Sequence, residues 1–177
     1  YGQESFEVAA KFLRETCTPT EYAIPAYRLE NVLSENGGVK RGICTVDNGY
    51  LKKIEETFEV QRGADGKING VTWDGKSMEM SDNDHASMNL FCIHHNVFDN
   101  LEKRFEKFLR NNKDQLTGEF LLPIIFSDMV EDGDIKMKVI ETGGEWFGVT
   151  YPEDGPIVRE KLKELVNKGI YPEKLQL

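Results

Sequence analysis

The dipeptide Asn48-Gly49 constrains the fold of this chain more than any other feature, because it lies between two strand-like segments, 42–47 and 50–56. Asn-Gly strongly favours a two-residue turn with positive φ at both positions, and such a turn joins antiparallel strands. The flanking segments contain isoleucine, valine, threonine and tyrosine, which are typical of strands. The sequence therefore predicts a β-hairpin here, and any fold of the chain must contain it.

Four other segments have the apolar spacing or the terminal residues of helices. Ser5 is expected to cap the first helix, and Pro123 is tolerated in the first turn of the third, which is apolar nearly all round. Asp154 is expected to cap the last helix, and Gly169 to end it. The predicted helices cover residues 5–16, 97–109, 119–131 and 154–169.

Strand-like segments occur between these helices without a regular strand-helix repeat. Glycine-containing breaks between residues 62 and 80 predict a small peripheral hairpin. The mixture predicts the α/β class, with a mixed β-sheet flanked by helices in a single domain over residues 1–177. Further strands are predicted at 22–29, 86–93, 135–141 and 146–150.

The composition restricts the partners of the chain. Its 31 acidic and 22 basic residues give a net charge of -9, which opposes binding to nucleic acid or to an anionic membrane. The sequence contains neither a signal peptide pattern nor a long apolar segment, so we expect a cytoplasmic protein without membrane contact. Cys17, Cys44 and Cys92 follow no disulfide or zinc spacing and are expected to be buried free thiols.

Other candidate residues are better explained by packing than by chemistry. His85, His94 and His95 have no cysteine or carboxylate partner at metal-ligand spacing, so no metal site is predicted. Trp73 and the phenylalanine-rich helix around Phe105 are expected in the core rather than under a nucleobase.

Two features indicate a portion of a larger protein. No glycine-rich loop of the kind that cradles phosphates follows a strand anywhere in the sequence, so a self-contained nucleotide site is not expected. The chain also begins at Tyr1 without a methionine and enters a helix pattern at once. We therefore expect a fragment.

Three segments, in this order, resemble the sugar-1-phosphate nucleotidyltransferases, or NDP-sugar pyrophosphorylases, particularly bacterial UTP-glucose-1-phosphate uridylyltransferase-like proteins. Residues 33–44, with 54–56, resemble the glycine-containing strand and the Glu-Glu sugar-binding strand of the family. Residues 87–91 resemble the strand that lines its sugar pocket. The most specific match is 145–154, together with the ending at 169–175.

The resemblance implies the C-terminal, sugar-phosphate-binding portion of a Rossmann-like, GT-A-like fold, without the N-terminal portion that binds the NTP. The complete enzyme would transfer a nucleotidyl group from an NTP to a sugar 1-phosphate with Mg²⁺, releasing pyrophosphate. The fragment would hold no catalytic residue and no Mg²⁺, and would be inactive alone. The substrate-binding residues implied are Arg41, Gly42, Glu56, Asn89, Trp146 and Thr150.

The chain departs from the wider family at two places. Thr57-Phe58 stands where a phosphate-contacting lysine is usual, and Gly148 or Val149 stands where a metal-binding aspartate is usual. Two alternatives therefore remain open, a phosphocholine-type cytidylyltransferase fragment and a noncatalytic interaction or regulatory domain. A severed sheet is also expected to expose an apolar edge or face and to form homo-oligomers.

Overall fold

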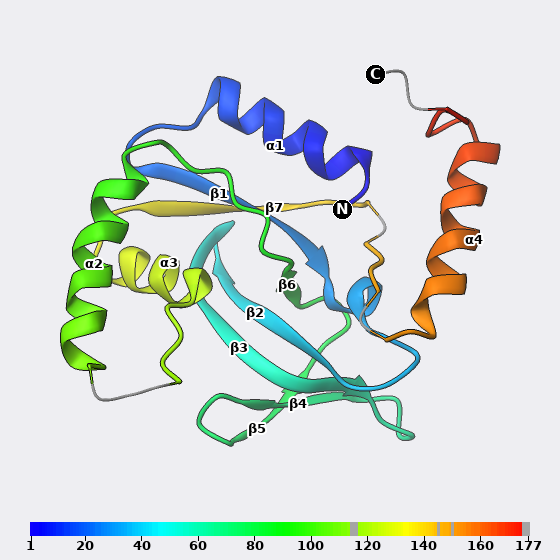
Figure 1. Cartoon of the computed structure of the whole chain (residues 1–177), viewed down its shortest axis with the longest axis horizontal. Helices are drawn as coiled ribbons and strands as arrows, with labels where there is room; N and C mark the ends of the chain where they lie inside the picture. The colour runs from blue at the N-terminus through cyan, green and yellow to red at the C-terminus, as the bar shows by residue number, and fades with distance from the viewer. Residues whose placement is uncertain (114–116, 145, 150, 175–177) are drawn as a thin grey trace. The chain divides into compact units, whose positions relative to one another are not determined.

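The computed structural model describes residues 1–113, 117–144, 146–149 and 151–174. It divides into two compact units, Tyr1–Glu145 and Trp146–Leu177. Within the described residues, the first unit is built on a mixed seven-stranded sheet with helices, as Figure 1 shows. The α/β class predicted from the sequence is therefore confirmed, whereas a single domain over 1–177 stays a prediction.

The sheet has the strand order β2-β6-β1-β7-β3-β4-β5, and β2 also pairs with β3. The pairings therefore form a closed ring of five strands, β2, β6, β1, β7 and β3. β4 and β5 extend the sheet beyond β3. Among the described strands, only β1 and β7 are parallel neighbours. The strands are β1 Glu21–Arg28, β2 Val39–Asp47, β3 Tyr50–Arg62, β4 Ile68–Thr72, β5 Ser77–Met80, β6 His85–Ser87 and β7 Lys136–Glu141.

The predicted hairpin is the junction of β2 and β3. Asn48 and Gly49 have φ values of 50° and 80°, as the expected turn requires. β3 continues beyond the predicted end at residue 56, because its second half pairs with β4. The peripheral hairpin of β4 and β5 is also confirmed.

The helices of the first unit are α1 Gln3–Glu15, α2 Val97–Asn111 and α3 Leu122–Glu131, with a short 3-10 turn, η1, at Leu29–Val32. Ser5 is not the cap of α1, which begins after Gly2. Instead the Ser5 hydroxyl is buried and lies 2.7 Å from the Tyr27 hydroxyl and 2.9 Å from the Thr142 hydroxyl. This residue was misassigned because its partners come from β1 and from the segment after β7.

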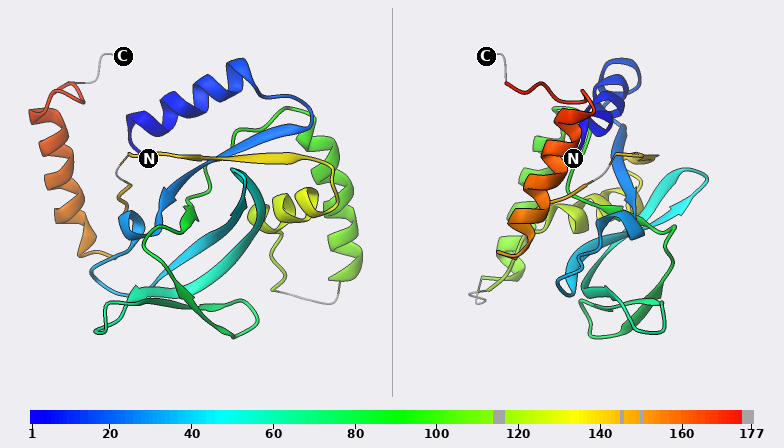
Figure 2. Two further views of the ribbon diagram at one scale, coloured as in Figure 1. Left: turned by 180° about the vertical axis from the view of Figure 1, so that it is seen from behind. Right: turned by 90° about the vertical axis from the view of Figure 1, so that its right-hand side faces the viewer.

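α1 and α3 cover opposite faces of the sheet, as consecutive residues of β1 demonstrate. Tyr22 belongs to the main core with Phe126 and Met129 of α3. Ala23, which points the other way, packs with Phe12 of α1. The views in Figure 2 show α1 and α3 against the strands, and the predicted flanking of the sheet by helices is confirmed.

The predicted strand 86–93 is too long. β6 ends at Ser87, and Asn89 has a φ of 57°, a left-handed conformation that interrupts an extended strand. The chain regains the sheet at Cys92, whose amide donates to the Ala23 carbonyl over 2.8 Å.

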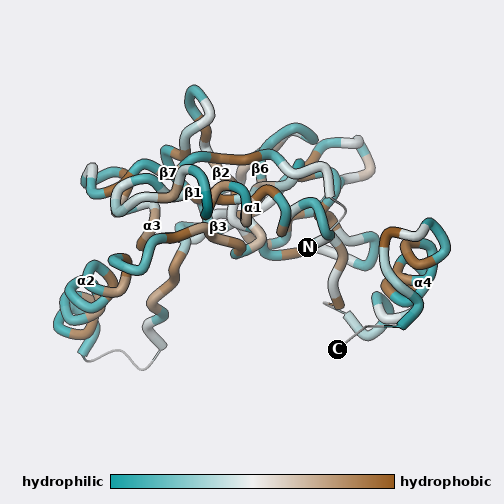
Figure 3. The backbone as a smooth tube through the Cα atoms, turned by 90° about the horizontal axis from the view of Figure 1, so that it is seen from above, coloured by the Kyte–Doolittle hydropathy of each residue, from teal (hydrophilic) through white to brown (hydrophobic). Residues whose placement is uncertain are grey.

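The expectation of core positions for two aromatic residues is wrong. Trp73 is 60% exposed and Phe105 is 44% exposed. Trp73 lies in the turn between β4 and β5. Phe105 lies on α2, along which hydrophobic and hydrophilic residues alternate, as the colours of Figure 3 show. In the part of the chain that the structure describes, no helix has the length and apolarity needed to cross a membrane.

The second unit contains α4, Asp154–Asn167. Residues 146–149 are not in a strand, so the predicted strand 146–150 is not formed there, and Thr150 lies outside the described residues. Asp154 is the first residue of the helix rather than its cap, and its carboxylate accepts a hydrogen bond from the Tyr151 amide over 2.7 Å. Gly169, with a φ of 72°, follows the end of α4 as predicted.

Candidate functional site

Gly42 is the centre of a junction of three neighbouring strands. It is paired with Glu56 of β3 on one side and with Ser87 of β6 on the other. A Cβ atom at Gly42 would lie 2.8 Å from Cγ2 of Ile54 and 3.3 Å from both Glu56 Oε1 and Ser87 Cβ. Only glycine lets these side chains close over β2 without displacement.

The Glu56 carboxylate is nearly buried but is not isolated. The residue is 9% exposed, and its Oε2 lies 3.4 Å from Lys40 Nζ. Lys40 is two residues from Gly42 on β2 and therefore points to the same face. Its ammonium also lies 5.0 Å from the centroid of the Phe58 ring and 5.8 Å from that of Trp73. Lys40 thus links the carboxylate to an aromatic pair.

Glu56 opens into a groove of about 580 Å³ between β3, α3 and the β4–β5 turn. Carboxylates outnumber ammonium groups on its wall, so the groove offers many acceptor oxygens for hydroxyl groups. The groove is lined by Lys52, Lys53, Ile54, Glu55, Glu56, Trp73, Ile124, Ser127, Asp128, Val130 and Glu131.

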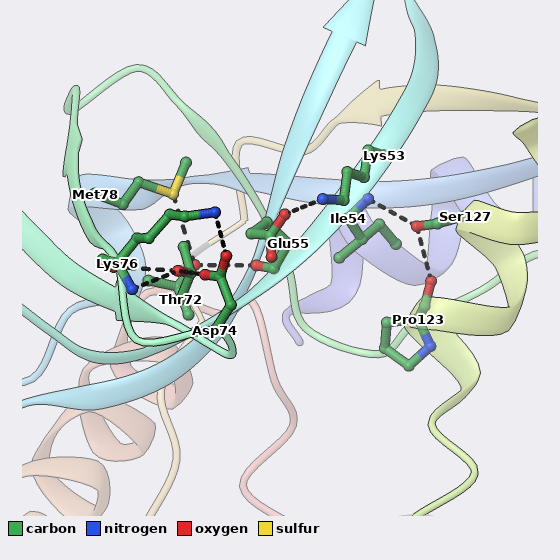
Figure 4. Close-up of polar contacts among 10 residues, drawn as sticks. Lys53, Ile54, Glu55, Thr72, Asp74, Lys76, Met78, Pro123 and Ser127 are labelled. Carbon is green, nitrogen blue, oxygen red and sulfur yellow. Dashed lines mark hydrogen bonds and ion pairs between the residues drawn. The ribbon is translucent and has the colours of Figure 1, made fainter.

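Ser127 fixes the two walls of this groove to each other. Its hydroxyl accepts a hydrogen bond from the Ile54 amide over 2.8 Å and donates to the Pro123 carbonyl over 3.0 Å, as Figure 4 shows. Ile54 belongs to β3, whereas Pro123 and Ser127 belong to α3. Asp128 also lines the groove, and burial raises its pKa, although nearby Arg104 opposes the effect.

Arg41 occupies the opposite face of β2 from Gly42. Its guanidinium is largely buried and donates to the Val32 carbonyl through Nε at 2.9 Å and Nη2 at 2.6 Å. Nη1 donates to the Lys40 carbonyl over 2.8 Å. Burial lowers the pKa of Arg41 to about 10. The guanidinium thus joins η1 to β2. The contact between Arg41 and a sugar phosphate that the resemblance implies stays a prediction.

Asn89, which the resemblance also implies, is not among the residues that line the groove. Asn89 is exposed two residues beyond Ser87, and its amide donates to the Ser87 hydroxyl over 3.3 Å. Trp146 belongs to the second unit, where its ring lies against Gly148. Thr150 is outside the described residues.

Sequence reasoning missed Lys40, Ser87 and Trp73. Lys40 could have been found from its spacing of two from Gly42, which places both residues on one face of a strand. Trp73 precedes Asp74-Gly75, a turn signal that favours exposure over burial.

The described residues contain no group of three or more histidine, cysteine, aspartate or glutamate residues that could hold a metal ion. Neither a scan against models of protein families nor a search of curated proteins found a match to this chain.

Proposed function

We propose that this chain is the sugar-phosphate-binding portion of a sugar-1-phosphate nucleotidyltransferase. The observation that carries the proposal is Glu56, a nearly buried carboxylate at a strand junction that opens into a groove of about 580 Å³. A carboxylate has two acceptor oxygens, which suit the hydroxyl groups of a sugar. The adjacent Lys40 ammonium can donate to a phosphate or to a further hydroxyl.

The topology supports the same proposal. A parallel pair, β1 and β7, lies inside a mixed sheet with helices on both faces, an arrangement compatible with part of a Rossmann-like, GT-A-like fold. The sequence has no glycine-rich phosphate loop, so residues beyond this chain would hold the triphosphate. The reaction would be in-line attack of the sugar phosphate on the α-phosphorus of the NTP, with pyrophosphate as leaving group. Such chemistry depends on positioning and on charge neutralisation.

A phosphoalcohol such as phosphocholine is the second candidate, because Trp73 gives the groove an aromatic wall that can contact a cation. However, the Lys40 ammonium already lies over both Phe58 and Trp73. A second cation at these rings would meet repulsion from Lys40, so we favour the sugar phosphate.

The binding part of the proposal is tested by NMR titration of the ¹⁵N-labelled 177-residue chain with glucose 1-phosphate. Titration to about 10 mM would saturate even a site with a Kd near 1 mM. We expect saturable shifts at the amides of Gly42, Glu56 and Ser87. Glu56→Gln should abolish them, whereas Glu79→Gln, the same change on the exposed β5 strand, should not.

The outcomes are distinct. Shifts that are absent from this junction, or unchanged in Glu56→Gln, would reject the proposed site. Stronger binding of phosphocholine than of glucose 1-phosphate would favour the second candidate. The chain alone should release no pyrophosphate from an NTP, glucose 1-phosphate and Mg²⁺. Turnover by the chain alone would reject the proposal that residues beyond it hold the triphosphate.

A further inference from the structure

Trp73 is presented to solvent by a tightly bonded turn rather than buried. The residue is 60% exposed, and it lines the same groove as Glu56. It follows β4 directly, and the turn to β5 is closed by backbone bonds of 2.9 Å from the Thr72 amide to the Lys76 carbonyl and from the Gly75 amide to the Thr72 carbonyl. A large apolar side chain held in an open groove is a candidate contact for a ligand.

Side chains of the turn hold this arrangement in place. The Thr72 hydroxyl donates to Asp74 Oδ1 over 2.5 Å and accepts from the Lys76 amide over 3.2 Å. Asp74 and Lys76 also form an ion pair, and Figure 4 shows these contacts beside Glu55 and Lys53 of β3. The turn therefore restricts the backbone on either side of Trp73.

The indole ring is supported from β2 and β3. Its centroid lies 5.6 Å from that of Phe58, with an angle of 47° between the ring planes. The Lys40 ammonium lies 5.8 Å from the indole centroid and 3.4 Å from Glu56 Oε2. One ammonium group thus connects the aromatic surface with the carboxylate, which places both within the span of a small ligand.

A pyranose ring matches these two groups, because its C–H faces are apolar and its hydroxyl groups lie around the edge. An aromatic face can pack against the C–H groups while carboxylates accept hydrogen bonds from the hydroxyls. Asp128 adds a further carboxylate from α3. Resting on the proposed function, we infer that Trp73 is the stacking platform for the pyranose ring of the sugar phosphate.

The tryptophan content of the chain permits a direct spectroscopic test. The sequence contains two tryptophans, Trp73 and Trp146, so Trp146→Phe leaves Trp73 as the sole indole fluorophore. Titration of that variant with glucose 1-phosphate should change the fluorescence with the same Kd that NMR shifts at Gly42 report. Unchanged fluorescence during such saturation would overturn the inference.

Substitutions at Trp73 separate an aromatic platform from a merely apolar surface. Trp73→Ala and Trp73→Leu should each raise the Kd for glucose 1-phosphate roughly tenfold, whereas Trp73→Phe should stay within about threefold. Equal affinity of the wild type and Trp73→Leu would refute stacking. Because Trp73 is largely exposed, circular dichroism and the melting temperature should be nearly unchanged, and Trp73→Phe provides the folded control.

The two proposals fail in different ways. If the wild-type chain shows no saturable NMR shift with glucose 1-phosphate, the proposed function is rejected, and this inference with it. If binding depends on Glu56 but not on Trp73, only the stacking role is rejected.

Discussion

Gly42→Ala is expected to destabilise the strand junction and to move the Glu56 carboxylate. The new methyl group would lie 2.8 Å from Cγ2 of Ile54, a distance at which an atom has to shift. Ile54 is 2% exposed, and its amide is bonded to Ser127 of α3, so its displacement disturbs the core. Overpacking of a core costs about 1–3 kcal/mol, and we expect about 2 kcal/mol here.

A double-mutant cycle tests whether the loss of stability in Gly42→Ala arises from the contact with Ile54. Ile54→Ala removes the Cγ2 atom and should cost about 2–5 kcal/mol by itself, because it leaves a cavity. In that background Gly42→Ala should cost much less than in the wild type, giving a favourable coupling of about 1–2 kcal/mol. If the losses in free energy of unfolding from the two substitutions were simply additive, the two side chains would not collide.

Chemical denaturation followed by circular dichroism measures these free energies of unfolding. A loss of about 2 kcal/mol also lowers the melting temperature by about 4–8 °C in a chain of this size. Gly63→Ala is the control, because its nearest neighbour is the exposed Asp65 carboxylate, which can swing away. If the free energy of unfolding of Gly42→Ala lies within about 0.5 kcal/mol of the wild-type value, the close packing described at this junction is wrong.

Four further results are expected. Ser127→Ala should lower the free energy of unfolding by about 1–3 kcal/mol, because the buried Ile54 amide loses its acceptor; a neutral change in a denaturation experiment would contradict this. Burial raises the pKa of Cys44 to about 12, so at pH 8 a disulfide reagent should label the partly exposed Cys17 first and Cys44 only on unfolding. Bonds from the turn lower the pKa of Asp74 from 3.8 to about 2, so its stabilising contribution is present above pH 3.8 and is lost as the pH falls through about 2; an NMR titration of its carboxyl with a midpoint near 3.8 would contradict the bonding. Light scattering should reveal association that increases with concentration, because α2 exposes apolar side chains; a monomer at every concentration would argue against it.

Elements specified by local chemistry were predictable from the sequence. The Asn48-Gly49 turn depends on the φ preference of its own two residues, and α2 depends on the spacing of its own apolar side chains. Ser5 was not predictable in the same way, since its partners Tyr27 and Thr142 are far away in the sequence. Its polarity indicated a helix cap, whereas tertiary contacts place it in the core.

The candidate site was predictable only in part, because one register shift decides its composition. Regular pairing outward from the Asn48-Gly49 turn would set Gly42 opposite Glu55, but β2 and β3 shift register between Thr45 and Val46. The shift brings Glu56 opposite Gly42 instead, and successive residues of a strand point to opposite faces. Hairpin periodicity alone therefore assigns the wrong glutamate to the junction. The bulge, which no turn signal in the sequence marks, determines that the carboxylate beside Lys40 and Ser87 belongs to Glu56.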